Sequence, residues 1–146
     1  MIAYFQLWRP LRVITADEIV KPVCQTVISN TQSNVRIDPD AAGVYFAIQF
    51  GEQENSSTIY YRIQGGFFFL VAIISLVFVT FEVKYYLYLI GFHILSFLLI
   101  LLLLIIGCGY FSNSFYLADF LISYLVPVLS MAYIPWLIYY LRKTKH

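Results

Sequence analysis

The stretch LSFLLILLLLIIGCGYF, residues 95–111, decides the fold of this chain, because it is strongly apolar and carries no charge. It belongs to an apolar run over residues 85–111, which lies between two further apolar runs, over residues 65–81 and 115–141. A helix needs about 20 apolar residues to cross a hydrocarbon core of roughly 30 Å. The sequence therefore predicts three membrane-spanning helices joined by short polar breaks.

The composition separates the chain into two regions. Hydrophobic residues make up 61% of the 146 residues and charged residues only 12%, whereas soluble domains carry roughly 25% charged residues. Six of the eight acidic and five of the nine basic residues precede Gly65. We therefore expect an α-helical polytopic membrane protein, with a small extracytoplasmic α+β segment in residues 1–64 and three transmembrane helices in residues 65–146. The net charge of +1 gives no reason to expect a nucleic-acid partner, and membrane lipid is the expected surrounding.

Basic residues next to the predicted spans set the orientation. Lys84 lies in the break between the first two spans, and Arg142, Lys143 and Lys145 follow the third, so these two places share one side of the membrane. Cytoplasmic segments carry the excess of lysine and arginine. We therefore expect the C-terminus in the cytoplasm and residues 1–64 mainly outside, with the opening residues MIAYFQLW as a helical segment at the membrane.

An amphipathic helix is predicted over residues 16–29. Thr15 and Glu18 fit a capping box, and apolar residues then recur at the i, i+3 and i+4 spacing of one helical face. Pro22 lies inside this pattern and predicts a kink. The apolar face of this helix covers its own sheet, the bilayer surface or a partner protein.

A β-hairpin is predicted from VYFAIQF, residues 44–50, and TIYYRIQ, residues 58–64, which surround a polar loop. Apolar residues alternate with other residues in both segments, which is the period of a strand with one buried face. A few strands alone are marginal in water, so the apolar face needs a cover. We expect this hairpin to contact a partner, and its candidate residues are Phe46, Ile48, Tyr60, Tyr61 and Arg62.

Polar residues inside the predicted spans define a second candidate site. His93 lies in the second span and Asp119 in the third, at depths that differ by roughly 12 Å, so a direct ion pair between them is not expected. We expect His93 to be hydrogen-bonded within the bundle. Asp119 either accepts N–H bonds at the start of its helix or faces a partner or a polar cavity. The polar face of the third span predicts an interhelical seam of Tyr116, Asp119, Ser123, Ser130 and Tyr133.

The sequence predicts no catalytic, cofactor-binding or metal site. It lacks the zinc-protease, serine-hydrolase and phosphate-loop motifs, so we do not expect an enzyme. The two cysteines, Cys24 and Cys108, are expected at different depths, as small apolar fillers without a disulfide. Gly91, Gly107 and Gly109 are expected to allow close packing of neighbouring elements.

The segment YRIQGGFFFLVAIISL, residues 61–76, follows a β-rich segment and precedes two more apolar runs and a basic tail. This order resembles the small membrane proteins that accompany exosortases, the bacterial transmembrane transpeptidases that process sorting signals. The resemblance implies a non-catalytic accessory protein in a bacterial inner membrane. We therefore predict an accessory or assembly subunit whose partner is another integral membrane protein or a second copy of the chain. The alternative is a subunit of an oligomeric transporter or channel that uses a polar seam around Asp119 and His93.

Overall fold

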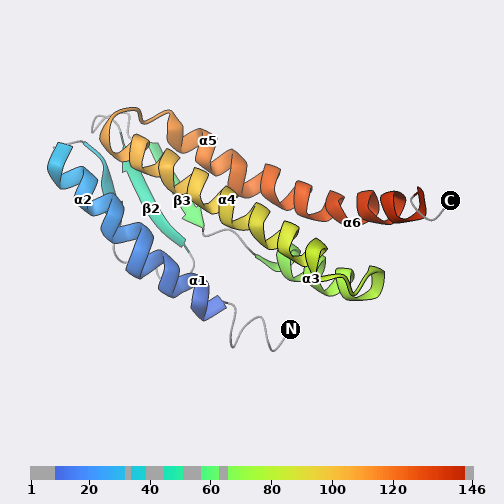
Figure 1. Ribbon diagram of the computed structural model, residues 1–146. Helices are drawn as coiled ribbons and strands as arrows, with labels where there is room; N and C mark the ends of the chain where they lie inside the picture. The colour runs from blue at the N-terminus through green and yellow to red at the C-terminus, as the bar shows by residue number, and fades with distance from the viewer. Residues whose placement is uncertain (1–8, 32–33, 39–44, 51–56, 63–65, 144–146) are drawn as a thin grey trace.

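Figure 1 shows the computed structural model as an N-terminal helix, a small sheet and a helical hairpin with two long arms. The structure describes residues 9–31, 34–38, 45–50, 57–62 and 66–143, most of which are helical. In chain order, the elements are α1 (Arg9–Thr15), η2 (Ala16–Val20), α2 (Lys21–Thr31), β1 (Arg36–Asp38), β2 (Tyr45–Phe50), β3 (Ser57–Arg62), α3 (Phe67–Val79), α4 (Val83–Gly109), α5 (Ser114–Phe120), η3 (Leu121–Leu125) and α6 (Val126–Lys143).

The N-terminal helix is continuous from α1 through η2 to α2, so the prediction of a helix over residues 16–29 placed its start too late. Thr15 is not a cap, because its Oγ1 donates to the carbonyl of Leu11 at 2.8 Å inside the helix. The buried stripe of this helix recurs every four residues and comprises Arg12, Ala16, Val20 and Cys24. The last three of these belong to a hydrophobic cluster with the sheet and with α4, so the amphipathic face covers the protein's own sheet.

Two π-helical turns, η2 and η3, each end two residues before a proline, at Pro22 and Pro127. After each turn, a backbone N–H bonds the carbonyl five residues earlier. Proline has no N–H, and its ring clashes with the carbonyl four residues before it in an α-helix. A wider turn moves that carbonyl aside, so the kink predicted at Pro22 takes the form of a π-helical turn.

The sheet is antiparallel, with strand order β1-β2-β3, and the predicted hairpin is confirmed. Ile48 pairs with Ile59, and Gln49 pairs with Thr58. Directly paired residues share a face, so the first pair lies on the inner face of the sheet and the second on the outer face. Ile48 is buried and Gln49 is exposed, in agreement with the predicted alternation.

Two helical segments of the described chain are long and apolar enough to cross a membrane: α4, and the continuous α5–η3–α6 helix over residues 114–143. By contrast, α3 has 13 residues and a length of about 20 Å, which is short of a hydrocarbon core of roughly 30 Å. It ends where Thr80 takes an extended conformation and its hydroxyl accepts the N–H of Glu82 at 3.2 Å. The second and third predicted spans are thus candidate spans in the structure. The first predicted span, which corresponds to α3, is not confirmed.

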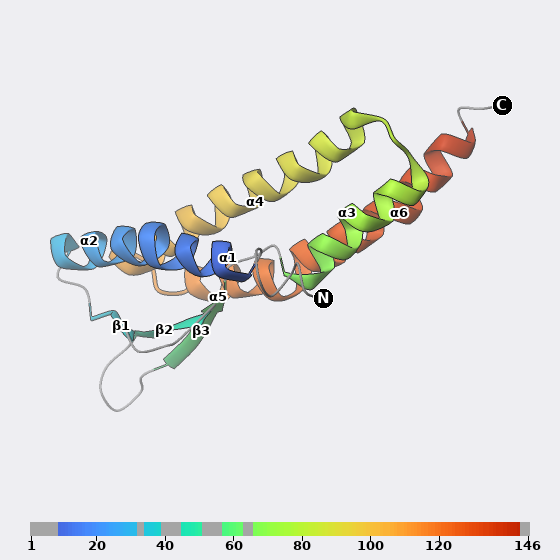
Figure 2. The same cartoon turned by 90° about the horizontal axis from the view of Figure 1, so that it is seen from below.

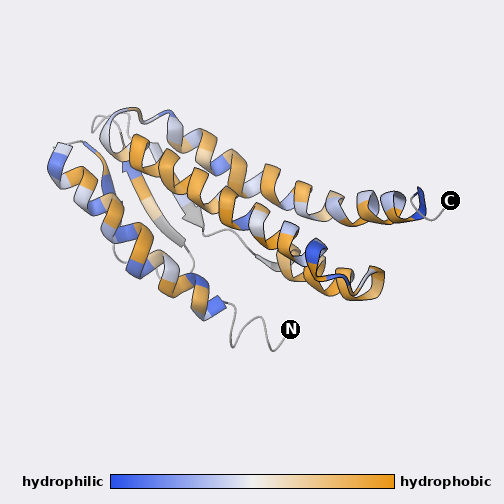
Figure 3. Ribbon diagram, viewed as in Figure 1, coloured by the Kyte–Doolittle hydropathy of each residue, from blue (hydrophilic) through white to orange (hydrophobic). Residues whose placement is uncertain are grey.

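Figures 1 and 2 show α3 lying along α6, with α4 and the α5–α6 helix as the two arms of the hairpin. Figure 3 shows hydrophobic residues around most of α3 and α4, whereas the N-terminal helix alternates between hydrophilic and hydrophobic positions. This contrast fits a membrane setting for the hairpin, since a helix that is apolar on every side must be buried in protein or in lipid.

Two hydrophobic clusters hold these elements together. The first joins the N-terminal helix and the sheet to the C-terminal half of α4 and to α5, and its buried members include Val20, Cys24, Ile48, Phe50, Ile100, Leu104, Cys108 and Phe115. The second joins α3 to the N-terminal half of α4 and to α6, through Phe69, Ala72, Leu76, Tyr85, Leu89 and Leu137. The sheet is therefore packed onto the long helices, so the described parts of the N-terminal and C-terminal regions share a core.

The glycines of α4 differ in what surrounds them. A Cβ on Gly107 would lie 2.6 Å from Cε1 of Phe115, and one on Gly109 would lie 3.1 Å from Cγ1 of Val27. Close packing is therefore confirmed at both positions. The same expectation is wrong for Gly91, because no atom of the described chain would lie within 4 Å of its Cβ.

Candidate functional site

The inner face of the sheet is attached to the helices through Ile48 and Phe50. Ile48 is fully buried, and the Phe50 ring lies 5.1 Å from the ring of Phe115 and 5.7 Å from the ring of Tyr116, measured between centroids. The Tyr116 hydroxyl also lies 3.4 Å from Oγ of Ser57 in β3. Ile48, a candidate for partner contact, is thus a core residue that anchors the sheet.

The outer face of the sheet, defined here by Gln49, Thr58 and Tyr60, is exposed. The Tyr60 ring is 67% exposed, which is a large apolar surface for a side chain on a strand. It is the one hairpin candidate whose described side chain is available to a partner. The side chains of the remaining hairpin candidates, Phe46, Tyr61 and Arg62, lie outside the described residues.

A row of exposed leucines lies on α4 at the same level as the sheet. This leucine face consists of Leu95, Leu98, Leu99 and Leu102, which are 68%, 54%, 47% and 52% exposed. Their spacing of three, four and seven residues places them on one side of the helix. Ile100 and Leu104, on another side of the same turns, share the core with Ile48 of the sheet.

His93 is hydrogen-bonded within the bundle, as predicted. Its Nε2 lies 2.9 Å from Oγ of Ser130, and Ser130 Oγ also donates to the carbonyl of Val126 at 2.6 Å. The serine hydroxyl has one proton, and the bond to Val126 uses it, so Nε2 is the donor to Ser130. The Phe69 ring of α3 lies 4.2 Å from the imidazole. His93 therefore joins α4 to α6 at the point where α3 also meets them.

The predicted polar seam is divided into separate local contacts. The Ser123 hydroxyl donates to Oδ1 of Asp119 at 3.2 Å, one turn away on the same helix. Ser130 bonds His93, and the Tyr133 hydroxyl donates to the carbonyl of Tyr85 at 3.1 Å. The π-helical turn η3 lies between Asp119 and Ser130, and its extra residue rotates the rest of the helix by about 100°. The predicted seam assumed a uniform α-helix, and the π-helical turn moves these residues off a single face.

Arg12 is a buried cation that the sequence prediction left out. It is 4% exposed, and a Cβ on Gly66 would lie 3.9 Å from each terminal nitrogen of its guanidinium group. The side chain thus reaches the backbone at the start of α3 and connects the N-terminal helix to the hairpin. The signal for it is the four-residue spacing that continues from Cys24 and Val20 back to Ala16 and Arg12.

Cys24 and Cys108 lie against each other, so the expectation that they occupy different depths is wrong. Both are fully buried in the same cluster, and their side chains share a hydrogen bond. The expectation failed because the N-terminal helix lies alongside α4 and shares a core with it.

A groove of about 430 Å³ lies between α4 and α6, and it is lined mostly by apolar side chains: Tyr88, Leu89, Phe92, Leu129, Ala132, Tyr133 and Trp136. Its surroundings offer no group of charged ligands. Among the described residues, no three His, Cys, Asp or Glu side chains come together as a metal ion would require.

Comparison of this chain with protein-family models, with curated protein sequences and with solved structures finds no match.

Proposed function

We propose that this protein is a non-enzymatic subunit of a membrane assembly, and that it binds an integral membrane partner through the outer face of the sheet and the leucine face of α4. The partner is another protein or a second copy of this chain. The proposed orientation places the sheet outside a bacterial inner membrane and the basic end of α6 in the cytoplasm.

One observation carries this proposal: a β-sheet is packed onto an apolar helix that is long enough to cross a membrane. The inner face of the sheet shares a core with Ile100 and Leu104, while Leu98 and Leu102 on the same turns are exposed. A membrane partner would bury the exposed leucines of α4, and its part outside the membrane would contact Tyr60 on the sheet.

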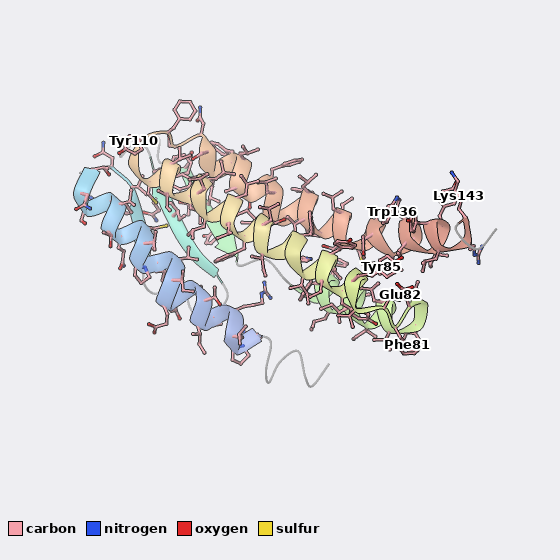
Figure 4. The ribbon with its side chains drawn as sticks, in the orientation of Figure 1. Phe81, Glu82, Tyr85, Tyr110, Trp136 and Lys143 are labelled. Atoms are coloured by element: carbon pink, nitrogen blue, oxygen red, sulfur yellow. The ribbon has the colours of Figure 1, made fainter. Side chains whose placement is uncertain are left out.

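The ends of the hairpin support the proposed orientation. Figure 4 shows Glu82 and Lys143 at one end of the helices and Tyr110 at the other. Lys84, which pairs with Glu82, and Arg142 also lie at the first end, so the basic residues of the described part of the hairpin lie there. Cytoplasmic ends of membrane helices carry this excess. The resemblance of residues 61–76 to exosortase-associated proteins agrees with this placement and makes an envelope-processing system the proposed setting.

Photo-crosslinking tests the proposal. A photoreactive amino acid is introduced at Tyr60, at Leu98 or at Ile74, which is as exposed as Leu98 but lies on α3, at 58% against 54%. We expect protein adducts of one defined mass from Tyr60 and Leu98, and lipid adducts alone from Ile74. Lipid adducts alone at all three positions would refute the proposal.

The mass of the adduct distinguishes the two kinds of partner. An adduct of two copies of the chain would indicate a homo-oligomer, and would direct attention to transport through the polar residues His93 and Asp119. In that case Asp119→Asn should abolish flux. An adduct with a different protein would support the accessory role.

A further inference from the structure

We propose that Cys24 and Cys108 are a disulfide site that fastens the N-terminal helix to α4. The two residues are the only cysteines of the chain, they are far apart in the sequence, and the fold brings them into one buried contact.

The backbone of α4 around Cys108 lies close to neighbouring side chains. Gly107 on one side of it leaves room for the ring of Phe115, and Gly109 on the other side leaves room for Val27 of α2. A Cβ at Gly109 would lie 3.1 Å from Cγ1 of Val27 and 3.4 Å from Cγ2 of Thr31. The backbone of α4 therefore lies directly against α2 at the turn that carries Cys108.

The two cysteine side chains lie in the same buried cluster. The thiols share a hydrogen bond, and both side chains are 0% exposed. A disulfide needs a sulfur–sulfur distance of about 2.05 Å, so closure requires the two neighbouring side chains to approach each other within the cluster that they share.

The oxidant in this reaction is another disulfide, either of a thiol oxidoreductase or of oxidised glutathione. The Cys24 thiolate attacks one sulfur of that disulfide, forms a mixed disulfide and releases the first thiol. Cys108 then loses its proton and attacks the Cys24 sulfur, which releases the second thiol. The protein loses two electrons and two protons, and the oxidant gains them as two thiols. Because both cysteines are buried in the folded chain, the exchange takes place before α2 docks on α4.

The proposed orientation places both cysteines toward the outer side, where disulfides form and persist. The contact itself does not depend on the proposed partner. Loss of crosslinks at Tyr60 and Leu98 would therefore refute the partner and leave the disulfide standing, whereas free thiols would refute the disulfide and leave the partner standing.

Thiol trapping tests the proposal. Membranes are quenched in acid, the protein is denatured, and a maleimide carrying a polyethylene glycol chain is added with or without prior reduction. We expect no maleimide on the unreduced protein and two after reduction. Two maleimides without reduction would overturn the proposal.

A displaced thiol provides the matched control. The double substitution Cys24→Ser, Gln25→Cys keeps two cysteines in the chain but moves one thiol from the buried stripe to an exposed position beside it. This variant should take two maleimides without reduction, and equal protection in both proteins would also overturn the proposal.

Discussion

Gly107 offers the sharpest test of the packing between α4 and α5. Its replacement by alanine places a Cβ 2.6 Å from Cε1, 2.7 Å from Cδ1 and 2.9 Å from Cζ of the Phe115 ring. Carbon atoms in ordinary contact are about 3.5 to 4.0 Å apart, so the ring must move by about 1 Å. That ring is 1% exposed and lies 5.1 Å from the ring of Phe50, which leaves it little room.

The expected cost is the balance of two opposing terms. Overpacking of a buried site costs about 1 to 3 kcal/mol, and the exchange of glycine for alanine inside a helix gains up to about 1 kcal/mol. Gly107→Ala should therefore lower the free energy of unfolding by up to about 2 kcal/mol. Gly91→Ala is the matched control on the same helix, because no described atom would meet its Cβ within 4 Å. Gly91→Ala should therefore show only the stabilising gain of alanine over glycine in a helix.

The assay is unfolding of the purified protein in mild detergent by increasing amounts of SDS, followed by circular dichroism. The two variants should move the midpoint in opposite directions. A third variant tests the cause: Phe115→Leu combined with Gly107→Ala should cost less than the two single changes together, because the smaller side chain makes room. Equal midpoints for Gly107→Ala and Gly91→Ala would refute the reasoning.

Three further outcomes are expected. Ser130→Ala should cost about 0.6 to 1.7 kcal/mol in the same assay, because it removes the hydrogen bond to the buried histidine, whereas Ser123→Ala should cost less; equal losses would contradict this. Ile48→Ala should cost about 2 to 5 kcal/mol by leaving a cavity, and Tyr60→Ala should stay within about 0.5 kcal/mol, so a reversed order would show that the sheet packs differently. A cysteine at Tyr60 should react with an impermeant maleimide on intact cells and one at Lys143 only after permeabilisation, and the opposite pattern would invert the orientation.

The sequence predicts those features that arise from local patterns. The alternation over residues 44–50 predicts the hairpin and the burial of Ile48 and Phe50, and the long apolar runs predict α4 and the α5–η3–α6 helix. Local pattern also explains the burial of His93, since an imidazole inside an apolar helix needs a hydrogen-bonding partner. Its bond to Ser130 meets that need.

Other features depend on contacts between distant segments, which no local pattern contains. The contact of Cys24 with Cys108 depends on where the N-terminal helix docks, and hydropathy alone suggests that it stays at the surface. The length of α3 depends on Thr80, whose extended backbone ends the helix although apolar residues continue to Phe81. Arg12 escapes a prediction from hydropathy because a charged residue is rarely expected on a buried stripe.

The π-helical turn η3 gives this protein an unusual sensitivity to chain length. One residue fewer between Leu121 and Leu125 would turn the widened segment into an ordinary helix and rotate everything after it by about 100°. Ser130 would then face away from His93, and Leu137 would leave the side of α6 that packs on α3. The apolar character of the helix would hardly change. The relative orientation of the two hydrophobic clusters therefore depends on the number of residues in one turn. A single-residue deletion there would leave the hydropathy of the helix nearly unchanged and still misalign the two clusters.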